Sequence, residues 1–126
     1  MTVRTLPQGL DILLVEDEML VAMLLQCVLE DAGCCVICAG FLDEALPLAR
    51  DRDLDAAVLD VNLHGERSYP VADLLAARGI PFVFSTGYGD ADLRTLYPGR
   101  AILAKPYDAD DLIAALSDAI GAGSGD

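Results

Sequence analysis

The fold of this chain is decided by the stretch Asp11-Ile-Leu-Leu-Val-Glu-Asp17, in which a short apolar run ends in two acids. Short apolar runs bounded by turn signals are typical of strands that are buried on both faces of a sheet. Three more short apolar runs also end at a polar residue: they stop before Asp60, before Ser85-Thr86 and before Lys105-Pro106. Their brevity and the neighbouring Gly and Pro residues favour strand over buried helix.

Helical patterns alternate with these strands in the first half of the chain. Gly33 is well placed to end a first helix, and Cys34 to Ala39 is predicted to be a second strand. A second helix is expected over Leu42 to Arg50 with Asp43 as its N-cap, although Pro47 favours a later start. The first helix is predicted from apolar residues at helical spacing: Leu20, Val21, Leu24, Leu25, Val28 and Leu29.

The same alternation continues after Asp60. A loop through Gly65 leads to a third helix from about Pro70 to Arg78, and residues 87–99 leave room for a short fourth helix of about eight residues. Asp108 is predicted to cap a final helix, and the Gly/Ser-rich residues 121–126 are expected to be a flexible tail. The buried stripe of the final helix is predicted to be Leu112, Ile113, Leu116 and Ile120.

Five strand–helix repeats predict a flavodoxin-like (βα)5 fold, a doubly wound parallel sheet with strand order 2-1-3-4-5, over a single domain of residues 1–120. Ligands of such sheets bind at the carboxyl ends of the strands, near the point where the strand order reverses. The acids Glu16, Asp17 and Asp60 follow the first and third strands. We therefore expect these residues, far apart in sequence, to meet at one edge of the sheet.

Charge and hydropathy exclude two classes of function. A net charge of −13, from 21 acidic and 8 basic residues, opposes the phosphate backbone of nucleic acid, so direct DNA or RNA binding is not expected. No apolar stretch approaches the ~20 residues of a membrane-spanning helix, and the N-terminus lacks a signal-peptide pattern. We expect a soluble protein of the cytoplasm.

Four cysteines cluster in one short stretch, at positions 27, 34, 35 and 38. The spacing Cys35-x-x-Cys38 is that of a redox or zinc pair, but the sequence contains no second pair. In a strand the two side chains point to opposite faces, because side chains alternate. Buried structural thiols are therefore preferred to a redox or metal role, which remains the alternative.

Four motifs together carry a resemblance to a known family: Leu14-Val-Glu-Asp-Glu18, Leu59-Asp-Val-Asn-Leu63, Ser85-Thr-Gly87 and Ala104-Lys-Pro106. From about Asp11 to Ile120 the chain resembles the receiver domain of two-component response regulators. Each motif alone is weak, but their order and spacing are specific. The resemblance implies a stoichiometric phosphoacceptor that promotes its own phosphorylation and dephosphorylation, and not a conventional enzyme.

The resemblance implies a role for each residue at the strand ends. Asp60 is the expected phosphoacceptor, attacking a phosphohistidine of a sensor histidine kinase or histidine phosphotransferase. Asp17, Asp60 and the backbone carbonyl of Asn62 would bind Mg²⁺, with Mn²⁺ as the alternative cation, and Glu16 would act through metal-bound water. Oxygen ligands of this kind suit Mg²⁺, which retains several waters.

The remaining implied roles concern the phosphoryl oxygens and their surroundings. Lys105 would supply a positive charge and Thr86 a hydroxyl donor, because phosphoryl transfer is catalysed mainly by positioning and charge stabilisation. Backbone N–H groups of Asn62 and Gly87 would add further donors. Pro106 would hold the turn that aims Lys105, and the Lys-Pro bond is often cis in this family.

Two departures from the common receiver pattern bear on how a signal leaves the site. Ile102 stands where many receivers carry a Tyr or Phe that rotates with the Thr. The segment Pro81-Phe-Val-Phe-Ser-Thr-Gly-Tyr-Gly89 resembles the "FAT GUY" motif of alphaproteobacterial single-domain regulators, with Ser85 for the usual Ala. We therefore predict that the signal leaves through Gly87 to Gly99, with Tyr88 as the mobile aromatic residue.

Several alternatives remain open at this stage. A regulator that switches the binding of an unknown downstream protein is preferred to a phosphate sink or shuttle between kinases. The chain is expected to be a stand-alone regulator, with a domain of a longer parent as the alternative. A flavodoxin-like or phosphatase enzyme is disfavoured because Glu16-Asp-Glu18 replaces a phosphate loop and Asp60-Val-Asn62 replaces Asp-x-Asp. A degenerate receiver is disfavoured because the reactive residues are present, and His64 is expected to be a plain loop residue.

Overall fold

A five-stranded parallel sheet forms the centre of the computed structural model, which describes residues 6–87 and 93–124. The strand order is β2-β1-β3-β6-β7, so the predicted order 2-1-3-4-5 is confirmed, with β6 and β7 as the fourth and fifth strands. The strands of this sheet are β1 (Asp11–Val15), β2 (Cys35–Ala39), β3 (Ala56–Asp60), β6 (Phe82–Thr86) and β7 (Ala101–Ala104).

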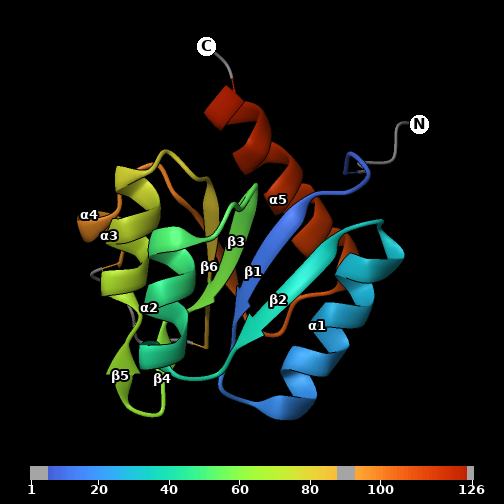
Figure 1. The fold of residues 1–126 in the computed structure, drawn as a ribbon. Helices are drawn as coiled ribbons and strands as arrows, with labels where there is room; N and C mark the ends of the chain where they lie inside the picture. The colour runs from blue at the N-terminus through green and yellow to red at the C-terminus, as the bar shows by residue number, and fades with distance from the viewer. Residues whose placement is uncertain (1–5, 88–92, 125–126) are drawn as a thin grey trace.

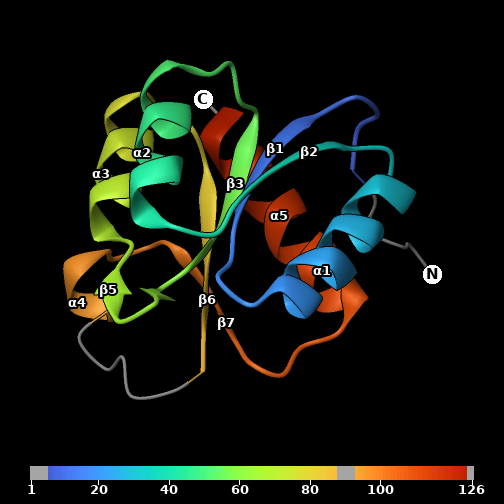
Figure 2. The same cartoon turned by 60° about the horizontal axis from the view of Figure 1, so that its bottom comes forward.

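Helices cover both faces of the sheet (Figure 1). One apolar cluster joins the sheet to α1 and α5, and contains Leu29 and Leu116. The other joins it to α2, α3 and α4, and contains Leu75 and Leu93. Turning the molecule separates the two layers clearly (Figure 2). The helices are α1 (Met19–Asp31), α2 (Leu42–Asp51), α3 (Tyr69–Ala77), α4 (Leu93–Leu96) and α5 (Ala109–Ser124).

Helix α1 buries only part of its apolar surface. Leu25 and Leu29 are buried, but Leu20 and Leu24 are 81% and 64% exposed, so the apolar spacing that predicts the helix does not by itself mark its buried face. The six apolar positions span two neighbouring stripes of the helix, and the sheet covers only one of them. Gly33 follows the helix with φ +96°, as expected for a glycine that ends a helix.

The start of helix α2 also differs from the prediction. Phe41 occupies the N-cap and no side chain caps the helix, so Asp43 lies in the first turn and is not the cap. Pro47 lies inside the helix and does not delay its start. Pro47 has no N–H for the carbonyl of Asp43, but Asp43 is exposed, so water can reach that carbonyl.

Helix α5 begins as predicted and ends later. The backbone N–H of Asp111 donates to Asp108 Oδ1 at 2.9 Å, and the N–H of Asp108 donates to Asp111 Oδ2 at 3.3 Å, which confirms Asp108 as the cap. The helix continues to Ser124, four residues beyond the expected end of the domain at residue 120. Adding a turn to a formed helix requires no new nucleation, which offsets the weak helix propensity of glycine.

A small antiparallel hairpin, which the sequence did not predict, follows β3. It consists of β4 (Asn62–Leu63) and β5 (Glu66–Arg67), joined by His64 and Gly65 with φ angles of 49° and 87°. Positive φ at both central residues is the geometry of a type I′ turn. Strands of two residues carry no detectable alternation, and His-Gly is a weaker hairpin signal than Asn-Gly.

The cysteines are less buried than predicted. Cys34 is buried, but Cys27, Cys35 and Cys38 are exposed, so the prediction of buried thiols is wrong for these three. Cys35 and Cys38 lie on β2, an edge strand of the sheet, whose side chains have less cover than those of the central strands. All four thiols are free. Among the described helices, none is both long and apolar enough to span a membrane.

Candidate functional site

The carboxyl ends of the strands lie at the bottom of Figure 1. Polar side chains that follow or end three of these strands meet there. The Nζ atom of Lys105 lies 3.2 Å from Glu16 Oε1 and 3.3 Å from Asp60 Oδ2. Glu16 and Asp60 are only 4% and 7% exposed. One lysine therefore pairs with two buried carboxyl groups from different strand ends.

Backbone hydrogen bonds between neighbouring strands hold these residues in register. The N–H of Glu16 donates to the carbonyl of Ala39 at 3.0 Å, at the end of the β1–β2 pair. The N–H of Lys105 donates to the carbonyl of Thr86 at 2.8 Å, across β6 and β7. Thr86 is buried and pairs with Ala104, the residue before Lys105. The sheet itself therefore sets the distances between the polar side chains.

A set of carboxylates beside Lys105 is suited to a divalent cation. Carboxylate oxygens of Glu16, Asp17 and Glu18 lie within 4.8 Å of one another, and in the described part of the chain no other His, Cys, Asp or Glu residues gather in this way. Asp60 is outside this set but shares Lys105 with Glu16. The site thus gathers four acids but one lysine, two of the acids in contact with it, and hard oxygen ligands of this kind fit Mg²⁺.

Glu18 is the member of this cluster that we did not predict. Its backbone N–H donates to Glu16 Oε2 at 3.2 Å, so both carboxylate oxygens of Glu16 have partners. The signal in the sequence was the third consecutive acid after β1. It was missed because Glu18, the N-cap residue of α1, reads equally well as an ordinary acid at a helix N-terminus.

Burial raises the pKa of Asp60 to about 8, and the neighbouring Glu16 carboxylate adds to this effect, while Lys105 opposes it. At neutral pH the isolated site therefore favours the protonated, uncharged form of Asp60. Positive charge brought close to the carboxyl group would favour ionisation, because opposite charges stabilise the charged form. A bound cation would therefore favour the ionised form of Asp60.

Asp17 and Lys105 keep their charges. Burial alone would raise the pKa of Asp17, but hydrogen bonds, led by the backbone N–H of His64, lower it overall. That N–H lies 2.9 Å from Asp17 Oδ2. Burial likewise acts to lower the pKa of Lys105, but Asp60 and Glu16 raise it overall. In the metal-free site Asp17 is therefore the ionised acid and Asp60 the protonated one.

The remaining predicted residues lie around this centre. Asn62 is in β4, directly after Val61, and its Oδ1 accepts the N–H of Gly65 at 3.0 Å. Gly87 is exposed, and a Cβ atom there would meet no heavy atom within 4 Å, so a ligand can approach it closely.

Two further predicted residues are near the Lys105 turn. The Lys105–Pro106 peptide bond is cis, as the resemblance implied. Ile102 is half-buried and pairs with Phe84 across β6 and β7, so an aliphatic side chain occupies the usual aromatic position. Tyr88, the predicted mobile residue, lies outside the described residues.

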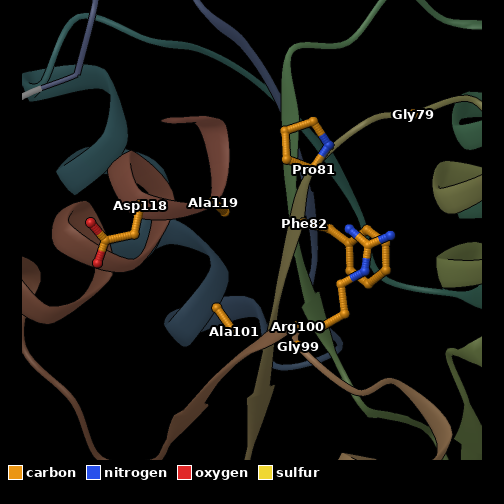
Figure 3. Close-up of a pocket in the computed structure, with 8 residues that line it drawn as sticks. All are labelled: Gly79, Pro81, Phe82, Gly99, Arg100, Ala101, Asp118 and Ala119. Carbon is orange, nitrogen blue, oxygen red and sulfur yellow. The ribbon is translucent and has the colours of Figure 1, made fainter. Parts of the chain in front are cut away.

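One hollow of about 510 Å³ lies at the other end of the sheet (Figure 3). It is lined by residues at the amino ends of β6 and β7, including Phe82 and Arg100, and by Asp118 of α5. The guanidinium carbon of Arg100 lies 4.4 Å from the centre of the Phe82 ring. The hollow is therefore separate from the acid cluster, which lies at the carboxyl ends.

Comparisons with known proteins agree with this arrangement. The solution structure of SdrG from Sphingomonas melonis Fr1 is 41% identical, with a TM-score of 0.78, over 91% of this chain and 98% of that one. The receiver domain of the sensor histidine kinase PA1611 from Pseudomonas aeruginosa PAO1, with magnesium coordinated in its active site cleft, is 27% identical, with a TM-score of 0.78, over 90% of this chain and 98% of that one.

A third relative is a longer protein. The uncharacterized transcriptional regulatory protein YbdJ of Bacillus subtilis (strain 168) is 33% identical over 110 residues, which are 84% of this chain and 48% of that protein. The chain thus spans about half the length of this relative. The family described as the response regulator receiver domain matches residues 12–117. This match includes β1, β3, β6 and β7, whose ends carry the acids and the lysine, and the chain accordingly belongs to the response regulator receiver domain family.

Proposed function

We propose that Asp60 is the phosphoacceptor of this receiver and that Lys105 and Thr86 assist the transfer. The observation that carries the proposal is the buried Asp60 carboxylate, 3.3 Å from the Lys105 ammonium group and beside a cluster of acids. A carboxylate held between a lysine and a candidate cation site suits a nucleophile that attacks a phosphoryl group. Flavin binding is not favoured, because Glu16-Asp-Glu18 stands where a phosphate-binding loop would be. Phosphatase chemistry is not favoured, because Asp60-Val-Asn62 is not an Asp-x-Asp pair.

The chemistry places one step on Asp60. A carboxylate oxygen attacks the phosphorus of a phosphohistidine, forming an O–P bond as the P–N bond breaks, and the electron pair returns to the imidazole nitrogen, which takes up a proton. Lys105 faces one phosphoryl oxygen and Thr86 donates its hydroxyl to another, because charge in the transition state lies on these oxygens. Backbone N–H groups of Asn62 and Gly87 supply additional donors. The product is an acyl phosphate, which a water molecule later hydrolyses.

Asp17, Asp60 and the backbone carbonyl of Asn62 would hold Mg²⁺, or Mn²⁺ in its place, and Glu16 would contact it through water. When bound, the cation neutralises the acids and the incoming phosphoryl charge. The site carries four acids for one lysine, and the related PA1611 receiver domain has magnesium in its cleft. Both observations support the assignment.

The phosphoryl donor is proposed to dock on the exposed apolar face of α1. Met19, Leu20, Met23 and Leu24 are 76%, 81%, 56% and 64% exposed, and their spacing places them on one side of the helix. They follow the acid cluster directly in sequence. Direct transfer requires the donor histidine to reach Asp60, so the rim of the site must be the contact surface. A sensor histidine kinase or histidine phosphotransferase with an apolar surface around its histidine fits this face.

The signal is proposed to leave through Gly87 to Gly99 and to change the binding of a downstream protein. Ile102 offers no ring, while Tyr97 lies after α4 with its ring centre 5.0 Å from that of Phe84, two residues before Thr86. Comparing amide hydrogen exchange with and without a beryllofluoride phosphate mimic tests the route. Altered exchange over residues 87–99 supports it, and unchanged exchange there contradicts it.

The phosphoacceptor is tested by labelling with acetyl phosphate in the presence and absence of Mg²⁺. Label is expected to depend on Mg²⁺ and to disappear in Asp60→Asn. Asp53→Asn is the matched control, because Asp53 is an exposed acid outside the site. Label that persists in Asp60→Asn would assign the acceptor elsewhere.

The docking face is tested separately with Leu20→Gln and Leu24→Gln. These changes are expected to slow transfer from a phosphorylated kinase but not labelling by acetyl phosphate, which needs no protein contact. Equal loss in both reactions would place their effect in the site itself.

A further inference from the structure

An aromatic pair joins two loops beside the acid cluster. The rings of Phe41 and His64 are stacked, with centres 4.4 Å apart and planes 15° from parallel. Phe41 precedes α2, and His64 forms the turn between β4 and β5. Both residues are exposed, Phe41 to 51%, so the stack does not belong to either apolar core.

The His64 backbone is connected directly to the proposed cation site. His64 is the one non-glycine residue with positive φ in the described chain, at 49°. Its backbone N–H donates to Asp17 Oδ2 at 2.9 Å. In the same turn, Gly65 N–H is held by the side chain of Asn62 at 3.0 Å. The hairpin of β4 and β5 therefore holds one expected ligand, Asp17, by a hydrogen bond and contains another, Asn62.

Left-handed conformations are disfavoured for residues with a Cβ atom, so a non-glycine residue needs support there. The Phe41 ring supplies a flat partner for the His64 ring from a loop fixed at the start of α2. Phe41 occupies the N-cap position of that helix, where its side chain makes no capping hydrogen bond. The turn contains no other stacked aromatic contact among the described residues.

We propose that Phe41 and His64 form a positioning pair, which holds the His64 N–H on Asp17 and thereby sets the affinity of the site for Mg²⁺. The proposal rests on the proposed function of the site. Groups that orient ligands from outside the coordination sphere typically change metal affinity by about 10- to 100-fold when they are removed. Since one backbone hydrogen bond survives in part without the stack, we expect the lower end of that range.

The test is a double-mutant cycle on Mg²⁺ affinity, measured by isothermal titration calorimetry. Phe41→Leu, which removes the ring but keeps an apolar side chain, is expected to weaken Mg²⁺ binding roughly tenfold. His64→Asn, which keeps a residue tolerant of positive φ, is expected to lose a similar amount. The double variant should lose little more than either single variant, because both remove the same contact. Phe41→Tyr retains a stacking ring and should bind Mg²⁺ as wild type does.

Leu96→Ala is the matched control, because Leu96 is also 51% exposed but lies in α4. Amide exchange at His64 gives a second readout that needs no metal: it should rise in Phe41→Leu and stay low in Phe41→Tyr. Unchanged Mg²⁺ affinity in Phe41→Leu, or additive losses in the double variant, would overturn the proposal that Phe41 and His64 position Asp17. The proposed function would stand in that case, provided that Asp60→Asn still abolished labelling. If wild type bound no Mg²⁺ and Asp60→Asn kept its label, the proposed function itself would fail.

Discussion

Replacing Asp60 with Asn is expected to stabilise the metal-free protein at neutral pH, although it removes the proposed acceptor. Burial and Glu16 raise the pKa of Asp60 from 3.8 to about 8. The folded protein therefore holds a proton that the unfolded chain has released between about pH 4 and pH 8, so stability falls as pH rises through this window. Below pH 4 both states are protonated and the penalty is absent.

The magnitude follows from this shift. At pH 7, roughly 3 pH units above the pKa of the unfolded chain, the penalty is at most about 4 kcal/mol, at ~1.4 kcal/mol for each pH unit. Glu16 shares the repulsion, and Asn leaves an amide beside Lys105, so we expect about half of this value. A gain of about 2 kcal/mol raises the melting temperature of a domain of this size by roughly 5–10 °C.

The assay is urea unfolding of wild type and Asp60→Asn in buffer with EDTA, at several values between pH 4 and pH 8. The advantage of Asp60→Asn should be near zero at the acid end and largest at the alkaline end. Asp53→Asn, at an exposed acid, should change stability little at any of these values. An advantage that did not vary with pH, or a less stable Asp60→Asn at pH 7, would refute the electrostatic account of the site.

Three further changes test other parts of the structure. Asp17→Asn should weaken Mg²⁺ binding at least tenfold in calorimetry, because it removes an expected ligand; unchanged affinity would refute the ligand assignment. Tyr97→Phe should lower the free energy of unfolding by about 1 kcal/mol, because the Tyr97 hydroxyl donates to Asp73 Oδ1 at 2.7 Å, and an equally stable variant would show that this bond contributes nothing. Asp108→Ala should cost about 1 kcal/mol in urea unfolding through loss of the α5 cap, whereas Asp110→Ala, two residues further on in the first turn, should cost less.

The sheet and most of the candidate site could be predicted because their signals are local in sequence. β1, β3, β6 and β7 are built on short apolar runs, and a polar residue at or directly after the end of each marks its carboxyl end. Parallel topology then brings Glu16, Asp60 and Lys105 together without further information. The strand order was confirmed, and Lys105 lies between Glu16 and Asp60, a pairing that we had not predicted.

The remaining features depend on tertiary neighbours that a single sequence does not reveal. The exposure of Leu20 and Leu24 depends on how far the sheet extends beneath α1, and that of Cys35 on the position of β2 at the sheet edge. Glu18 could not be distinguished from an ordinary acid at a helix start. The contact between Phe41 and His64 joins two loops with no common pattern, so neither residue carried a signal.

Asp60 and Lys105, which contact each other at the centre of the site, belong to strands that differ in how firmly their neighbours hold them. Asp60 ends β3, which is hydrogen-bonded to a strand on each side, whereas Lys105 follows β7, which has a neighbour on one side only. A change of charge at Asp60 therefore acts on a stiff support, and the compliant side of the pair is the lysine side. The displacement that accompanies phosphorylation should be concentrated at the outer margin of the sheet, where β7 and the end of β6 can shift without breaking the centre.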